Sequence, residues 1–254
     1  GGTSFDVSVV QGGRIGVVTQ GEVDRLPVRL PMVEMRTIGS GGGSIAAVDA
    51  GGRLAVGPRS AGATPGPVAY GRGGTEPTVT DANLMLGRLS AERFLGGDMR
   101  LDAAATRAAL QAKLADPLGL SVEEAANGVI RIAASSMSNV VKRVTTERGL
   151  DARDFPMVAF GGAGPLHAVL VARELQMPRV IIPNAPGHFS AFGMLVADLR
   201  RDYVRTRFTP LEAMDFAQVN AQFQAMEEEG AREIRRAAVK VGALSIQRGL
   251  DMRY

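Results

Sequence analysis

The sequence predicts an α/β fold, on three observations. An apolar run at 158–160 leads into a glycine turn at 161–164, and apolar residues at helical spacing follow. An alternating strand pattern begins soon after a second glycine turn at 1–3. A long amphipathic helix pattern occupies 121–144, behind the capping pair Ser121 and Glu124. Strands and helices mixed along one chain in this way are typical of the α/β class.

The glycine turn at 161–164 is suited to contact with a ligand. Glycine has no Cβ, so the backbone can approach a bound group closely. The helix predicted to start near Gly164 offers unpaired N–H groups and a positive dipole end to an anion or a nucleoside. Pro165 is tolerated in a first helical turn. Many such turns only let a helix pack close to a strand, so this pattern alone leaves both interpretations open.

The first residues of the chain form a comparable pattern. Gly1, Gly2 and Thr3 precede a strand at 7–10, and a hairpin turn brings the chain back at 14–18. Backbone N–H groups and a hydroxyl at such a turn can cradle phosphate oxygens. Asp6 is spaced to reach a cation or a water beside them. The alternative is an ordinary hairpin entry in which Asp6 caps its own turn.

The segment 37–89 is the most unusual part of the sequence. Residues 44–56 read as a hairpin, and residues 57–77 are dense in glycine and proline. That density is compatible with a disordered linker, but a hairpin and a capped helix flank the segment closely. We therefore expect an ordered, irregular loop that wraps a site. Within the segment, residues 40–44 are a candidate second anion nest.

Two acidic residues of this segment could face the site, Glu76 and Asp81. Asp81 has a simpler interpretation, because Thr80 and Asp81 precede a helix pattern at 82–88 and are residue types that cap helices. His167 lies one turn into the helix after the 161–164 turn. It could donate a proton or support a ligand from behind, or it could be a buried histidine with satisfied hydrogen bonds.

The remaining segments read as scaffold. A helix is predicted at 102–114, and the helix after Gly164 is predicted to end near Gln176. A buried strand at 180–182 and a short helix at 189–196 follow. The predicted elements of the last part are a strand at 201–208 and a largely helical stretch at 211–241.

Composition limits the chemistry. The 254 residues include no Cys, which excludes disulfides, thiolate zinc sites and a cysteine nucleophile. The two histidines, His167 and His188, are too few for a multi-histidine metal site within this chain. The net charge is +3, and the basic residues are scattered beside acidic ones, so we expect no nucleic-acid partner. No apolar run of membrane-spanning length and no signal-peptide pattern occur, so we expect no membrane partner and a cytoplasmic protein.

A family resemblance adds to these observations. A strand with Gly-Gly-Thr and Asp at one end, and a strand–Gly-Gly-Ala-Gly–helix later, resemble the actin-like ATPase superfamily. The match is closer to the hydantoinase A / 5-oxoprolinase family, and the residues that carry it are GGTSFDVSVV, the whole of 37–89, FLGGDM, ERGLD, FPMVAFGGAGPLHA and the closing DMRY. That family contains N-methylhydantoinase subunits and one subunit of acetone and acetophenone carboxylases.

The resemblance implies a fold and a domain organisation. The fold is an actin- or sugar-kinase-like (ribonuclease H-like) ATPase domain, with 37–89 as an inserted glycine-rich hairpin region. Residues 1–205 correspond to the second half of the ATPase core, and 206–254 to the start of a carboxy-terminal domain. The family's amino-terminal half falls outside this sequence, so we expect a fragment of a longer protein.

The resemblance also implies a function. ATP with Mg²⁺ would phosphorylate the amide oxygen of a cyclic amide such as a hydantoin or 5-oxoproline, and water would then open the ring. The phosphates would lie on Gly1, Gly2 and Thr3, and the adenosine on Gly161, Gly162, Ala163 and Gly164. Asp6 would hold the metal or its water, with Asp81 as a second metal candidate. Thr3, Asp6 and His167 are the candidate catalytic residues.

Three alternatives stay open. The first is a subunit of an ATP-dependent ketone carboxylase, which shares the phosphorylation step. The second is a simple sugar or acetate kinase, against which the 37–89 segment argues. The third is a non-catalytic fragment or binding module. The family also implies a B-type partner subunit, and hence a hetero-oligomer.

Overall fold

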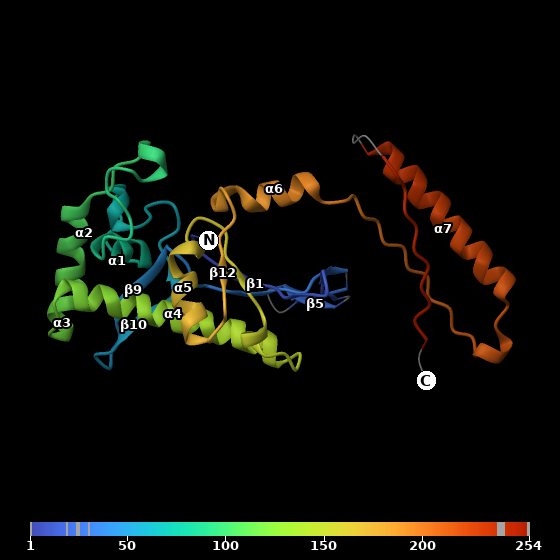
Figure 1. The fold of residues 1–254 in the computed structure, drawn as a ribbon, viewed down its shortest axis with the longest axis horizontal. Coiled ribbons are helices and arrows are strands. Elements are labelled where there is room, and N and C mark those ends of the chain that lie inside the picture. The colour runs from blue at the N-terminus through green and yellow to red at the C-terminus, as the bar shows by residue number, and fades with distance from the viewer. Residues whose placement is uncertain (1, 19, 24–25, 30, 238–241, 253–254) are drawn as a thin grey trace. The chain divides into compact units, whose positions relative to one another are not determined.

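The computed structural model of the protein describes residues 2–18, 20–23, 26–29, 31–237 and 242–252. They form two compact units, Gly1–Leu195 and Val196–Tyr254. The named strands and helices α1–α5 belong to the first unit, and α7 belongs to the second (Figure 1). The boundary expected after residue 205, between the ATPase core and a carboxy-terminal domain, stays a prediction.

The described strands pair two by two into small sheets. The antiparallel pairs are β1 (Phe5–Val7) with β8 (Arg36–Ile38), β2 (Val10–Gln11) with β3 (Arg14–Ile15), β4 (Val17–Val18) with β7 (Met32–Val33), β5 (Gly21–Val23) with β6 (Leu26–Val28), and β9 (Ser44–Val48) with β10 (Leu54–Ser60). The parallel pair is β11 (Met157–Val158) with β12 (Val180–Ile181). β12 was expected to be buried, but Ile181 is 48% exposed, because β12 has one described partner strand in its sheet.

The helices follow most of the predicted segments. Their bounds are α1 (Val79–Met85), α2 (Ala103–Leu110), α3 (Asp116–Leu118), α4 (Val122–Thr146), α5 (Gly164–Glu174), α6 (Phe189–Val196) and α7 (Phe216–Arg236). A π-helical stretch, Gln111–Ala115, joins α2 to α3. Short 3-10 turns lie at Val68–Tyr70, Leu95–Gly97, Ala152–Asp154, Pro186–His188 and Leu211–Ala213.

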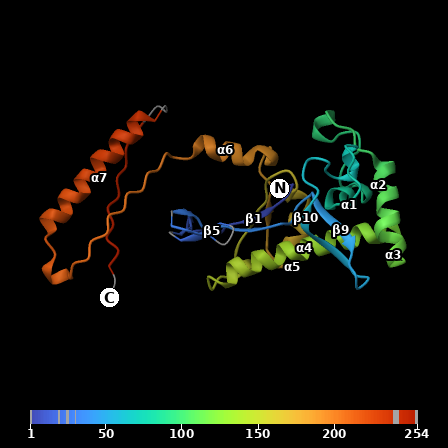
Figure 2. The same cartoon turned by 180° about the vertical axis from the view of Figure 1, so that it is seen from behind.

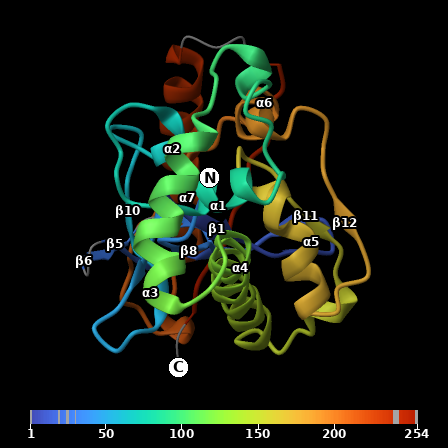
Figure 3. The ribbon, with the colours of Figure 1, turned by 90° about the vertical axis from the view of Figure 1, so that its left-hand side faces the viewer.

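The long helix α4 is the centre of the first unit. Its capping box is as predicted: the Ser121 hydroxyl accepts from the Glu124 amide at 3.2 Å, and the Glu124 carboxylate accepts from the Ser121 amide at 2.9 Å. One stripe of α4 is buried against α1, α5 and β10. Seen nearly along its axis, α4 lies between α5 on one side and α2 and α3 on the other (Figure 3).

The hydrophobic core is built around the buried stripe of α4. Small side chains on α4, such as Ala125, Ala126 and Ala133, let neighbouring elements approach closely. Leu110 and Leu114 from the segment before α3 fill the space beside them, and both are fully buried. A second cluster joins the later turns of α4 to α5 and includes Met137, Val141 and Val171.

The 37–89 segment is ordered in the way the sequence indicated. The β9–β10 hairpin is present, with Ala47 opposite Ala55 (Figure 2). The loop behind it is tied back by backbone hydrogen bonds, since Ala61 N–H donates to Gly43 at 2.9 Å and Ala46 N–H donates to Pro77 at 2.8 Å. The structure therefore shows a hairpin and a folded loop, while the description of this region as an insertion stays a prediction.

The start of α1 differs from the prediction. Thr78, not Thr80, is the N-cap, and the helix starts at Val79. Asp81 is the third helical residue, and its carboxylate accepts from the Thr78 amide at 2.8 Å. This is a capping box with Asp in the usual Glu position, which the sequence did not single out because Asp is shorter than the residue that normally closes the box.

The second unit contains α7 and the extended segments around it. The strand predicted at 201–208 is wrong, because those residues are irregular. Tyr203 instead donates its hydroxyl to Glu233 of α7 at 2.7 Å, and Arg248 lies over the Phe223 ring at 5.3 Å. The helical stretch predicted at 211–241 shortens to α7, and its residues 238–241 lie outside the described residues.

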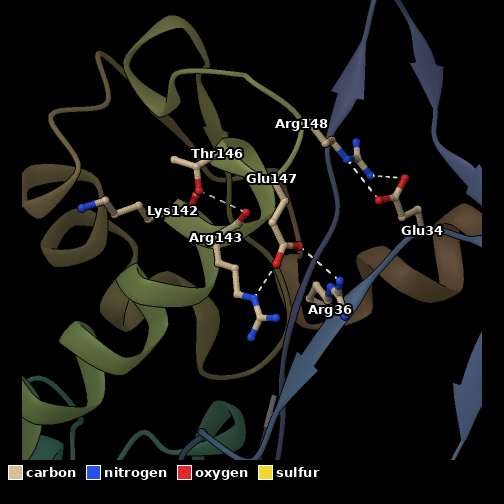
Figure 4. A network of polar contacts seen from close by, with 7 residues as sticks. All are labelled: Glu34, Arg36, Lys142, Arg143, Thr146, Glu147 and Arg148. Atoms are coloured by element: carbon tan, nitrogen blue, oxygen red, sulfur yellow. Dashed lines mark hydrogen bonds and ion pairs between the residues drawn. The ribbon is translucent and has the colours of Figure 1, made fainter.

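A polar network joins the end of α4 to the strands before the hairpin (Figure 4). Glu147 accepts from Arg143 on the same helix at 2.6 Å and from Arg36 on β8 at 3.1 Å. Arg148 pairs with Glu34, and its side chain is 20% exposed. Exposed ion pairs contribute little free energy, so this network mainly fixes where the 34–36 segment lies against α4. In the described part of the chain, no helix is both long and apolar enough to cross a membrane.

Replacing Gly74 by alanine is expected to lower the free energy of unfolding by about 3 kcal/mol. A Cβ at this position would collide with the carbonyl oxygen of Gly66, a backbone atom held inside the loop. Gly187→Ala is the control, because a Cβ there meets nothing within 4 Å. Urea unfolding of both variants measures the difference, and equal stabilities would contradict the folded state of the 57–77 loop.

Candidate functional site

The first glycine turn contacts the 37–89 segment. Gly1 lies outside the described residues, while Gly2 and Thr3 are exposed. The Gly43 amide donates to the Gly2 carbonyl oxygen at 2.6 Å. A Cβ on Gly43 would lie 3.0 Å from that oxygen and 2.8 Å from Ser60 Oγ. Glycine at position 43 is therefore what allows this approach.

The turn at 41–43 also contacts two helix starts. The Gly42 carbonyl oxygen accepts from the Thr80 amide at 2.8 Å and from its hydroxyl at 2.9 Å. A Cβ on Gly42 would lie 3.9 Å from the Cβ of Ala163, just before α5. Gly2, the 41–43 turn and Ala163 of the 161–164 turn thus meet at one place, between the starts of α1 and α5. The family resemblance implied that the first and the last of these turns face one nucleotide, whereas the contacts through 41–43 were not predicted.

Most amides of the predicted anion nest at 40–44 are bonded within the chain. Four of the five have such partners: Ser40 N–H donates to Ile38, Gly41 N–H to the Ser44 hydroxyl, Gly43 N–H to Gly2, and Ser44 N–H to Gly41. These four bonds make the turn a connection between segments, while an anion contact at the Gly42 amide stays a prediction. Ser40 and Ser44 are accordingly buried.

The 161–164 turn is open to a ligand on one side. Gly161 has a φ of +85°, a conformation that favours glycine, and its amide donates to Pro186 at 2.8 Å. A Cβ built on Gly162 or Gly164 meets nothing within 4 Å. Helix α5 starts at Gly164 with Pro165 in its first turn, as predicted. The space beside this turn can therefore receive a group from outside the chain.

Asp6 lies on β1 directly after the first turn. Its carboxylate accepts from the Thr37 hydroxyl at 2.6 Å and from the Ser4 hydroxyl at 3.0 Å. Thr37 is its partner residue on β8. Two hydroxyls thus orient an exposed carboxylate beside the Gly2–Thr3 turn. The roles of Asp6 in catalysis and metal binding stay predictions.

Asp81 is fully buried and serves as a hub of hydrogen bonds. Its two oxygens accept from the amides of Val68 (3.3 Å), Ala69 (2.7 Å) and Thr78 (2.8 Å), and from the Thr78 hydroxyl (2.8 Å). Burial raises the pKa of Asp81, and the hydrogen bond from the Thr78 side chain opposes this. These contacts support the capping interpretation, while its role as a metal ligand stays a prediction.

His167 is buried without a hydrogen bond. The fourth residue of α5, it is 1% exposed, and neither ring nitrogen has a hydrogen-bond partner in the described part of the chain. Burial lowers the pKa of His167 to about 4, and the Arg88 guanidinium adds to the shift. The imidazole is therefore neutral at neutral pH. A buried polar group without a partner is rare in folded proteins, and both interpretations of His167 stay predictions.

The next feature is the arrangement of side chains that could bind a metal ion. Within the described ranges, no group of three or more His, Asp or Glu side chains is arranged to hold a metal ion. Asp6 is exposed and Asp81 is enclosed by its own hydrogen bonds. Of the two metal candidates, Asp6 alone is thus accessible to an ion from solvent.

The fold is of the α/β class, and glycine turns that meet at a helix start are typical of domains that bind phosphate-bearing ligands. The model of the hydantoinase/oxoprolinase family matches residues 1–203. The chain belongs to that family.

Relatives of known structure give the same assignment. The chain is 45% identical to caprolactamase subunit alpha of Pseudomonas jessenii over 92% of its length. The crystal structure of that organism's ATP-dependent caprolactamase matches with a TM-score of 0.74 at 43% identity over 94% of the chain. A nucleotide-free structure of acetone carboxylase matches with a TM-score of 0.79 at 33% identity over 92% of the chain. The chain covers 34–35% of these three proteins, so it spans about a third of their length.

The free energy of unfolding is expected to decrease as the pH is lowered, because of His167. The pKa of this group is about 4 in the folded protein against an ordinary 6.5, so between these values the unfolded chain binds more protons. Stability is therefore lost as the pH falls through this window, by up to about 3 kcal/mol. His167→Asn should remove this loss in urea unfolding between pH 7 and about pH 4. His188→Asn, at an exposed position, should keep it, and parallel curves for all three proteins would contradict the assignment.

Asp81→Ala is expected to lower the free energy of unfolding by about 3 kcal/mol or more, because it leaves several buried donors unpaired. The comparison variant is Glu124→Ala, which removes the exposed capping box of α4 and should cost about 1 kcal/mol. Both are measured by urea unfolding with and without Mg²⁺. A gap between wild type and Asp81→Ala that widens with Mg²⁺ would show instead that Asp81 binds the metal.

Proposed function

We propose that this chain is part of the ATP-using region of an enzyme that hydrolyses a cyclic amide. The observation that carries the proposal is the convergence of the 1–3, 41–43 and 161–164 turns, in a chain 45% identical to a caprolactamase subunit. The actin-like character of the fold belongs to this proposal. It is supported by the match to two proteins whose descriptions are ATP-dependent.

The residues present fit a nucleotide. A Cβ on Gly2, Gly162 or Gly164 would meet nothing within 4 Å, so the backbone of both turns can be approached closely. The unpartnered nitrogens of His167 lie in the first turn of α5, behind the 161–164 turn. Such a group calls for a polar partner that the described residues do not supply.

Each candidate residue then has a role. Gly2 and Thr3, with Gly1 before them, hold phosphate oxygens through amides and a hydroxyl. Asp6, oriented by Thr37 and Ser4, binds Mg²⁺ or a water on it. Gly161, Gly162, Ala163 and Gly164 lie along the adenosine.

ATP supplies a phosphoryl group that makes the amide reactive. A lactam is a poor electrophile because its nitrogen shares electrons with the carbonyl group. If the amide oxygen formed a bond to the γ-phosphorus and ADP left, the ring carbon would become open to water. Water would add to that carbon, the C–N bond would break as the nitrogen takes up a proton, and a second water would release phosphate from the resulting acyl phosphate. The transfer itself needs positioning and charge neutralisation, which backbone amides and Asp6 provide.

His167 serves as a neutral hydrogen-bonding group in this scheme. Its low pKa, about 4, keeps the imidazole uncharged, so one nitrogen can donate and the other can accept. That is suited to moving or holding a proton near the reacting groups. Asp81 contributes by fixing the start of α1, whose Thr80 holds Gly42.

The full-length enzyme would work in the cytoplasm with a second, B-type subunit. The named relative is a subunit alpha, which agrees with a multi-subunit assembly. A ketone carboxylase subunit is the second candidate, and the TM-score of 0.79 to acetone carboxylase supports it. A non-catalytic binding role is the third candidate.

The test is phosphate release by the full-length protein with its second subunit, Mg²⁺ and ATP. Cyclic amides (5-oxoproline, hydantoins and caprolactam) should each be compared with ketones plus bicarbonate. Release coupled to a ring-opened amide is the expected result. Release only with a ketone and bicarbonate would favour the carboxylase, and ATP that is neither bound nor hydrolysed would contradict both.

Asp6→Asn is expected to lower lactam-dependent phosphate release by about 10–100-fold and to raise the Mg²⁺ concentration needed. Asp98→Asn is the matched control, since Asp98 is exposed and far along the chain from the three turns. Equal loss in both variants would show that the effect does not come from the site.

A further inference from the structure

A pocket lies in the 37–89 segment, next to the place where the glycine turns meet. Its volume is about 490 Å³, within the range of small-molecule sites. Its lining includes Arg59, Ser60, Ala61, Gly66, Gly74 and Glu76. Nothing in the roles proposed above uses this pocket.

The pocket adjoins the phosphate-type turn. Ala61, in its wall, donates its amide to Gly43 at 2.9 Å, and Gly43 in turn donates to Gly2 at 2.6 Å. Ser60 Oγ lies 2.8 Å from where a Cβ of Gly43 would be. Two backbone hydrogen bonds through Gly43 therefore connect the pocket wall to the Gly2–Thr3 turn.

The wall carries one ion pair, between Arg59 and Glu76. Nη2 of Arg59 lies 2.5 Å from Oε1 of Glu76. This contact uses one guanidinium nitrogen and one carboxylate oxygen, so Nη1, Nε and Oε2 can bond to a ligand. The pocket thus presents a strong donor and a strong acceptor side by side.

The loop holds these two side chains at the pocket wall. Gly74 approaches the Gly66 carbonyl too closely for any side chain, and Gly66 N–H donates to Ala61 at 3.2 Å. Gly66 and Gly73 have φ values of +77° and +88°, which favour glycine. The loop that carries Glu76 is therefore closed against the strand end that carries Arg59.

A cyclic amide presents the complementary pair. Its ring forces the amide to be cis, so the carbonyl oxygen and the N–H lie on the same edge. Arg59 can donate to the carbonyl oxygen, and Glu76 can accept from the N–H. The oxygen has two lone pairs, so a bond to Arg59 leaves one for another partner.

We propose that this pocket binds the amide edge of the cyclic amide, with Arg59 and Glu76 as the residues that recognise it. This rests on the proposed function and adds its substrate subsite. Recognition by a charged acceptor makes the N–H of the ligand necessary. A ketone has no such N–H, so this pair would also favour lactams over ketones.

The test compares ε-caprolactam with N-methylcaprolactam, and pyrrolidinone with N-methylpyrrolidinone, in the full-length protein. Dissociation constants are measured by calorimetry, alongside lactam-dependent phosphate release. The wild type should bind each N–H lactam about tenfold more tightly than its N-methyl partner. Glu76→Met should reduce this preference to less than about threefold, because the acceptor is lost. Arg59→Met should weaken binding of both members of a pair by about tenfold.

The controls are Arg107→Met and Glu123→Met. These residues form another exposed ion pair, at 2.7 Å, outside the pocket lining. They should leave the N–H preference unchanged, and ATP affinity should stay within about twofold of wild type in all four variants. A preference that survives in Glu76→Met, with lactam-dependent phosphate release intact, would overturn this subsite and leave the proposed function standing. No lactam-dependent release in the wild type would overturn the proposed function and this subsite together.

Discussion

The backbone hydrogen bond from Gly43 to Gly2, at 2.6 Å, is the contact on which the site depends. It joins the first residues of the chain to a turn that is also bonded to the start of α1 through Thr80 and lies against Ala163 before α5. No side chain fits between these segments. A Cβ at Gly42 would lie 2.7 Å from Thr80 Oγ1, closer than packed atoms approach. Positions 42 and 43 need glycine because neighbouring segments of the chain leave no room for a Cβ. Gly2, Gly162 and Gly164 differ, because a Cβ on each would meet no atom within 4 Å.

Local patterns in the sequence predicted most of the elements correctly. The capping box of α4, the hairpin β9–β10 and the strand–turn–helix around Gly161 are all set by residues close in sequence. The failures concern bonding partners that the local patterns did not specify. Four amides of 40–44 bond within the chain, one of them to the distant Gly2, and the alternation at 201–208 has no partner strand among the described residues. The family resemblance, now shown for residues 1–203, supplied the function that periodicity could not.

Two buried polar side chains differ in how their hydrogen-bonding groups are satisfied. Asp81 and His167 are both enclosed, at 0% and 1% exposure, and both have a shifted pKa. Asp81 accepts from amides and a hydroxyl of two segments, the 68–69 turn and Thr78, so its cost of burial is offset within the fold. His167 has no such partners in the described residues. The sequence offered both as site residues, and their hydrogen bonding, which a sequence does not display, differs.

A main-chain hydrogen bond joins the 41–43 turn to Gly2, and this has an evolutionary consequence. Main-chain contacts persist when neighbouring side chains are exchanged, provided that the few glycines stay. The scaffold and the selectivity of such a domain can therefore change independently of each other. A caprolactamase and an acetone carboxylase both superpose on this chain, with TM-scores of 0.74 and 0.79, although the compounds in their names differ. If the pocket binds substrate as we propose, side-chain exchange in the wall of that one loop would be enough to change the carbonyl compound that such a frame accepts.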